Sequence, residues 1–225
     1  MRKGRKSGKR VIGSLCMCFI MLFSMNVNAV TQKADAKNMQ KTIKYIQKNK
    51  YALAAKYNNR LSQTAKEKCT LKMSPAMKKA YLKVIKQHPV NGFGTRKVIR
   101  NYYLTDMDQD KKADLLILTG SCEQDTRLTV YRYRKGRAKK AGTIDAMHTQ
   151  YSAYPNHRGI IEKSYSWEVN SISLITIRKN RLVREHIATM KKENYINIRC
   201  ELQSHYRSSG YGYSYNEWLD TSDLR

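Results

Sequence analysis

Six strand-length runs beyond residue 98, separated by short polar segments, are the feature that most constrains the fold of this chain. They are LLILT (115–119), RLTVYRYR (127–134), AKKAGTI (138–144), GIIEKSY (159–165), SISLITI (171–177) and RLVREHIAT (181–189). The segments around Gly136 and Asn180 have the composition of tight turns between consecutive strands. No long crossover segment interrupts the series, so we expect an antiparallel meander, resembling a propeller blade or a small sandwich.

The preceding part, residues 30–97, has helical periodicity instead. Apolar residues that would share one helix face are Met39, Ile43, Ile46 and Leu53 in the first half, and Met77, Leu82 and Val84 or Ile85 in the second. Ser74 followed by Pro75 is a helix start signal, because serine caps the first turn and proline fits its first position. The predicted class is therefore α+β, with N-terminal helices in 30–97 followed by a β-rich domain in 98–225.

The first 29 residues are typical of a secretory signal peptide. A basic segment, MRKGRKSGKR, precedes a run of fifteen mostly apolar residues, and Val27 and Ala29 are the small residues that a signal peptidase requires. The apolar run is shorter than the roughly 20 residues that a transmembrane anchor needs. A lipoprotein would need its cysteine after the apolar run, whereas Cys16 and Cys18 lie within it. We therefore predict a secreted, extracellular protein whose mature form does not span a membrane.

Charge indicates which partners this exported chain would attract. Without the first 29 residues, 38 Lys and Arg face 17 Asp and Glu. Such an excess favours polyanions irrespective of their sequence, and it can also serve only to keep a surface solvated. Outside the cell, the available polyanions are teichoic acids, anionic lipid, nucleic acid and acidic glycans. An anionic cell-wall polymer or glycan is the partner we expect, with no specific nucleic acid.

Four aspartates are concentrated in the segment TDMDQDKKADLLIL, residues 105–118, although acids are scarce in the chain as a whole. Asp106, Asp108, Asp110 and Asp114 occupy positions one, three, five and nine of a loop, and Lys112 at position seven can offer its backbone carbonyl. Alternate oxygen ligands in a tight loop, followed at once by a rigid strand, are typical of Ca²⁺ sites. The alternative is a loop whose carboxylates are neutralised by its own lysines.

This segment resembles the aspartate-rich calcium loop of FG-GAP and VCBS-like repeats, with the pattern D-x-D-x-D-G-x-x-E/D before an apolar strand. The wider stretch of roughly residues 100–185 is similar to uncharacterised exported proteins of Gram-positive gut bacteria. This resemblance implies a calcium-stabilised β-meander and no catalytic activity. Two departures stand out, because Lys111 replaces the glycine at position six, where φ is usually positive, and Met147 replaces a glycine further on. Ile117 at position twelve excludes an EF-hand.

A cell-wall-acting hydrolase with a structural calcium ion is the alternative to a non-catalytic binding module. Its candidate residues are Cys122 beside Glu123, His148, and the carboxylates Glu162 and Glu168 around Trp167. Nothing in their spacing shows that they meet. Beyond residue 29 the chain has three cysteines, Cys69, Cys122 and Cys200, so at least one thiol stays unpaired, and no zinc-ligand spacing occurs. Interleaved Tyr and Arg in YRYRKGR could contact a glycan, or form an ordinary exposed strand face.

Overall fold

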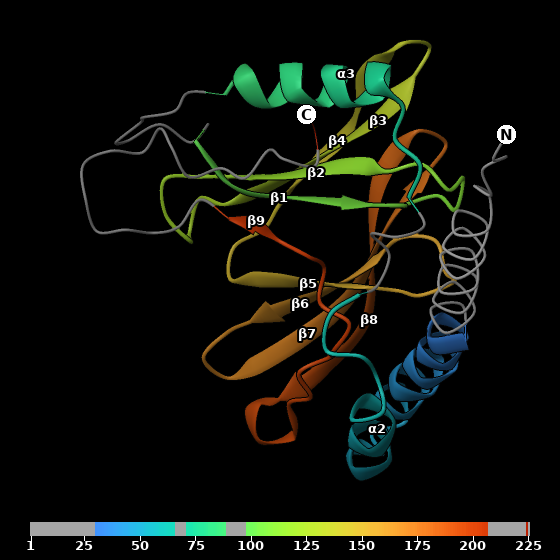
Figure 1. Cartoon of the computed structure of the whole chain (residues 1–225). Coiled ribbons are helices and arrows are strands. Elements are labelled where there is room, and N and C mark those ends of the chain that lie inside the picture. The colour runs from blue at the N-terminus through green and yellow to red at the C-terminus, as the bar shows by residue number, and fades with distance from the viewer. Residues whose placement is uncertain (1–29, 66–70, 89–97, 207–223, 225) are drawn as a thin grey trace, which may run out of the picture.

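A computed structural model describes residues 30–65, 71–88, 98–206 and 224 (Figure 1). The predicted signal peptide, Cys69 and the C-terminal residues 207–223 and 225 lie outside these residues. The helices are residues 30–47, α2 (Tyr51–Asn58), α3 (Pro75–Lys86) and the 3₁₀ turn η2 (Lys192–Asn194). The strands are β1 (Ile99–Thr105), β2 (Asp114–Thr119), β3 (Arg127–Arg134), β4 (Arg137–Asp145), β5 (Thr149–Ala153), β6 (Ile160–Tyr165), β7 (Val169–Arg178), β8 (Arg181–Lys191) and β9 (His205–Tyr206).

These strands form two antiparallel sheets, which confirms the predicted α+β class. The first sheet has the order β4-β3-β2-β1-β9, and the second has the order β5-β6-β7-β8. Within each sheet the first four strands follow the chain order, so the fold contains two successive meanders. The strand β9 then returns from the C-terminal part of the chain and pairs with β1.

Three apolar clusters place the two sheets between helices, as a sandwich with helices on both outer sides. One cluster lies between the sheets and includes Leu116 and Val130 from the first sheet and Ile160 and Ile175 from the second. The cluster on the outer side of the first sheet joins α3 to β1 and β2, and the cluster on the outer side of the second sheet contains the helix at 30–47. Figure 1 shows α3 and the N-terminal helices on opposite sides of the sheets.

The strand β2 explains why this arrangement is stable. All six of its residues are buried, because Leu115 and Ile117 face α3 whereas Leu116 and Leu118 face the second sheet. A strand covered on both faces needs apolar residues at successive positions, and LLIL supplies them. A continuous apolar run thus marks the strand that belongs to two cores at once.

The helix start at Ser74 and Pro75 agrees with the prediction, whereas the predicted apolar face through Leu53 does not. Ser74 caps α3 by accepting a hydrogen bond from the Met77 backbone N–H at 3.2 Å, and Pro75 is its first residue. Leu53, however, is exposed, because the chain turns at Asn49 with φ of 54° and α2 starts in a new direction. The expected continuous apolar face therefore ends at Ile46.

Within the described residues, no helix has both the length and the apolar character needed to cross a bilayer.

Both predicted tight turns are confirmed by the backbone. In the β3–β4 turn, Lys135 and Gly136 have φ of 51° and 77°, and in the β7–β8 turn Lys179 and Asn180 have φ of 48° and 63°. Two consecutive positive φ values match the right-handed twist of the flanking strands, and this is why such turns connect hairpins.

Candidate metal centre

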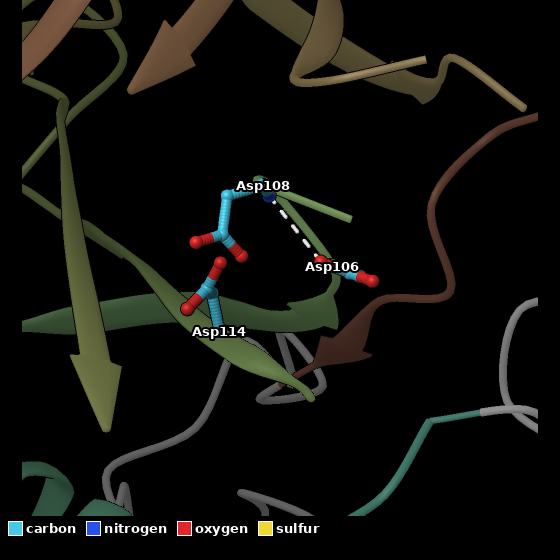
Figure 2. Close-up of side chains that lie close together, drawn as sticks. All are labelled: Asp106, Asp108 and Asp114. Atoms are coloured by element: carbon cyan, nitrogen blue, oxygen red, sulfur yellow. Dashed lines mark hydrogen bonds between the residues drawn. The ribbon is translucent and has the colours of Figure 1, made fainter. Parts of the chain in front are cut away.

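Three of the four predicted aspartates converge in the loop between β1 and β2. Asp106, Asp108 and Asp114 each offer a carboxylate oxygen such that the three oxygens lie within 4.8 Å of one another. Figure 2 shows the Asp108 and Asp114 carboxylates facing each other, with Asp106 hydrogen-bonded to the backbone of Asp108. Asp114 is the first residue of β2, so the sheet holds it rigidly, whereas the other two belong to the loop.

Asp106 organises the loop. One of its oxygens accepts hydrogen bonds from the backbone N–H groups of Asp108 at 3.3 Å and Asp110 at 3.1 Å, and the other accepts from Lys111 at 2.7 Å. Lys111 has φ of 63°, so the position that favours glycine in the resembling loops is indeed left-handed here. Three backbone hydrogen bonds to one carboxylate offset the strain of that conformation.

The Asp110 carboxylate, another predicted ligand, is not part of this group of three. Asp110 turns towards Lys112, accepting its backbone N–H at 2.9 Å, and the Lys112 ammonium lies 3.4 Å from the second Asp110 oxygen. The backbones of Lys72 and Lys112 pair as an isolated parallel β-bridge. In this pairing the Lys72 backbone N–H donates a hydrogen bond to the Lys111 carbonyl at 2.9 Å. The segment before α3 thereby holds the far side of the loop.

Two arginines complete the centre, and the sequence pattern did not point to either of them. The Arg132 guanidinium contacts the Asp108 carboxylate, and its Nε lies 3.8 Å from the Asp114 carboxylate. The more exposed Arg134 lies 3.2 Å from the same Asp108 oxygen. Arg132 is only 7% exposed, so YRYRKGR is not a wholly exposed Tyr/Arg face. The signal for Arg132 is the pairing of β2 with β3. Leu115 pairs with Tyr131, so Asp114 and Arg132, the next residues on the two strands, come to lie opposite each other.

Burial disfavours the negative charge of Asp114 even beside the two arginines. Burial raises the pKa of Asp114 to about 8, with further upward contributions from the charges of Asp110 and Asp106, against the Met107 backbone N–H, which donates at 3.0 Å. The Asp108 Oδ1 atom is buried and has no hydrogen-bond partner among the described residues. Hard carboxylate oxygens in this arrangement are suited to Ca²⁺.

The residues suggested for a hydrolase are scattered over the surface and the second sheet. Cys122 is exposed with a free thiol, whereas Cys200 is buried in the cluster beside the N-terminal helices. His148 Nδ1 lies 3.1 Å from Glu123 Oε2, and both side chains are substantially exposed. Glu162 is buried in an ion pair. These contacts bring His148 to a carboxylate without bringing either of them into an enclosed site.

Comparison of the chain with protein-family models, with curated proteins and with solved structures gives no match.

Proposed function

We propose that this protein is an exported, non-catalytic binding module, in which the Asp-rich loop binds Ca²⁺ and the basic surface associates with anionic cell-envelope polymers. The observation that carries the calcium assignment is the convergence of Asp106, Asp108 and Asp114, with one buried Asp108 oxygen left without a partner. The basic and apolar segments of residues 1–29 support export.

The ion would have a structural role. It would connect the loop to Asp114 and so to β2, the strand that belongs to both the inter-sheet cluster and the α3 cluster. Arg132 and Arg134 already supply part of the compensating charge, so we expect weak binding, in the range of about 10⁻⁴ to 10⁻³ M found for extracellular modules. A structural ion of this kind requires no catalytic group nearby.

Calcium should raise the melting temperature of residues 30–225 after the protein has been stripped with a chelator. At about 10 mM Ca²⁺, the expected affinity gives roughly 1.4 to 2.7 kcal/mol of stabilisation, or a shift of several degrees. Thermal unfolding followed by circular dichroism measures it. Asp108→Asn should abolish the calcium-dependent shift. The control Asp125→Asn removes a carboxylate from the β2–β3 turn and should retain it. If the parent protein has the same melting temperature with and without calcium, the assignment is refuted.

The basic surface includes the edges of both sheets. Arg137, Lys139 and Lys140 are exposed on the edge strand β4, and Arg181 is exposed on the edge strand β8, which contacts β4. Basic residues on an edge strand also prevent unwanted strand pairing between molecules. Their presence on two strands that contact each other nevertheless gives a polyanion several positive charges to contact.

Binding of residues 30–225 to lipoteichoic acid should weaken with salt, as a straight line of log affinity against log salt concentration. Displacement of condensed counterions by Lys and Arg produces this dependence. Calorimetric titration over a series of NaCl concentrations measures it, and neutral dextran is the control polymer, for which we expect no binding. An affinity that does not change with salt would remove electrostatic attraction as the basis of envelope association.

The hydrolase alternative receives less support from the structure. Its one favourable contact is the exposed pair of His148 and Glu123. The candidate nucleophile Cys122 is exposed, and its side chain interacts with the Asp125 carboxylate.

A further inference from the structure

The inner face of the second sheet contains a cavity that is separate from the Asp-rich loop. Its volume is about 390 Å³, within the roughly 300–1,000 Å³ typical of small-molecule sites. The residues that define its chemistry come from β5 to β8: Thr149, Glu162, Ser164, Ser171, Ser173, Arg184 and His186. Asp145 and Met147, at the end of β4 and in the β4–β5 turn, lie at its rim.

The cavity exists because small hydroxyl side chains replace large apolar ones along the sheet. At one end of the sheet, Ile160 and Ile175 pair across β6 and β7 and fill the space between the two sheets. Towards the other end, the pairs that line the cavity are Glu162 with Ser173 and Ser164 with Ser171. Serine is too small to fill the space beside the sheet, and an open cavity is left there.

Charge in the cavity is balanced within the protein. The Glu162 side chain is 3% exposed, and its two oxygens accept hydrogen bonds at 2.8 Å from Nε and an Nη of Arg184. The Tyr151 hydroxyl donates to one of the same oxygens at 3.4 Å. At the rim, the Asp145 carboxylate lies 3.5 Å from the Arg127 guanidinium. His186 lies outside these ion pairs, with its Nε2 3.2 Å from the Thr189 hydroxyl. An anionic ligand would therefore find no unpaired arginine, and a cationic ligand would find no unpaired carboxylate.

Apart from His186, the hydrogen-bonding capacity that remains is neutral. Ser164, Ser171 and Ser173 have no side-chain hydrogen bond to any described residue, so their hydroxyls can serve a ligand as donors or acceptors. The Glu162–Arg184 pair forms a rigid part of the cavity wall beside these serines, because each group holds the other in one orientation. A wholly apolar ligand would leave these hydroxyls without partners, at a cost in affinity.

We propose that this cavity binds one neutral sugar unit, held by the serine hydroxyls over the Glu162–Arg184 pair. Met147 is 51% exposed at the rim and offers an apolar contact for a sugar face. Trp167 is 92% exposed in the turn between β6 and β7, at the same end of these strands as Ser164 and Ser171. An exposed indole there is available to stack on a second sugar ring. The site depends neither on calcium nor on the positive surface.

Isothermal titration calorimetry of residues 30–225 with N,N′-diacetylchitobiose and with glucose, in the presence of chelator, tests the proposal. We expect saturable binding of at least one of these neutral sugars and weaker binding of glucuronic acid than of glucose. Ser171→Leu and Ser164→Leu fill the cavity from two strands, and each should weaken binding by about tenfold or more. Gln150→Leu is the control, because it makes a similar change at an exposed position that does not line the cavity.

Melting curves identify which variants are folded, so that a loss of binding can be assigned to the cavity. Absence of saturable binding by both neutral sugars would overturn the proposal. Glucuronic acid binding more tightly than glucose at a pH of about 8.5, where histidine is neutral, would also overturn it, because that result requires an unpaired cation. Equal affinities of parent, Ser171→Leu and Ser164→Leu would place any bound sugar elsewhere. None of these outcomes affects the calcium proposal, which is tested by the melting shift with calcium.

Discussion

Replacing Arg132 with methionine should lower the melting temperature of the calcium-free protein by roughly 10 °C, corresponding to about 3–5 kcal/mol for breaking a buried ion pair. The Arg132 side chain is 8% exposed and contacts Asp108 while its Nε faces Asp114. Without it, two carboxylates that face each other lose their buried counter-charge. Millimolar Ca²⁺ should then restore much of the loss, because a divalent cation can occupy the space between the same carboxylates. The calcium-dependent shift should therefore be larger in Arg132→Met than in the parent.

Arg134→Met is the matched control for this experiment. Arg134 contacts the same carboxylate at 3.2 Å, but its side chain is 50% exposed, and exposed ion pairs contribute only about 0–1 kcal/mol. Thermal unfolding of the three proteins, with chelator and with calcium, gives the comparison. If Arg132→Met melts with the parent in chelator, the ion pair is not the compensating contact that the structure indicates. If it melts low and calcium has no effect, Arg132 alone neutralises the loop and the metal assignment fails.

Replacing Gly159 with alanine should be among the most damaging single substitutions in the protein, at more than about 3 kcal/mol. Gly159 precedes β6 and has φ of 91°, where a side chain is strained. A Cβ atom there would lie 2.3 Å from the backbone oxygen of Ile175. Neither backbone can move easily, because the Gly159 N–H donates to the Met107 carbonyl at 2.9 Å and Ile175 pairs with Ile160. Urea unfolding measures the loss.

Gly136→Ala separates the close contact from the backbone conformation. Gly136 has φ of 77° in the β3–β4 turn, but nothing lies within 4 Å of the Cβ position. Its substitution should cost only about 1 kcal/mol, the cost of the left-handed conformation. Equal losses at the two glycines would mean that the contact with Ile175 contributes nothing.

Local patterns in the sequence were sufficient for most elements of the fold. Six strand-length runs correspond to six of the strands, because alternating or continuous apolar residues determine which faces are buried. Ser74 and Pro75 marked the start of α3. The strand β9 has only two residues, and a segment that short has no periodicity to read.

The position of Leu53 shows where a local pattern fails. Its spacing from Ile46 fits one continuous helix face, but the chain turns at Asn49 and Leu53 becomes 38% exposed. Conversely, Tyr81 is fully buried against the first sheet and donates to the Ala113 carbonyl at 2.7 Å, although the predicted apolar face of that helix omitted it. A tyrosine in a helix can be buried or exposed, and its partner decides which.

The spacing of the aspartates by itself determined a loop in which carboxylates approach one another, since alternate positions before a rigid strand bring side chains together. The contact of Asp110 with Lys112 is equally local, because the two residues are neighbours in the loop. Only the tertiary structure decided that Arg132 reaches Asp108 from another strand. The same holds for the cavity, whose serines are far apart from Arg184 and from Thr149 in the chain. Both sites depend on strand register, and register is fixed by the pairing of whole strands and the burial of their faces rather than by neighbouring residues.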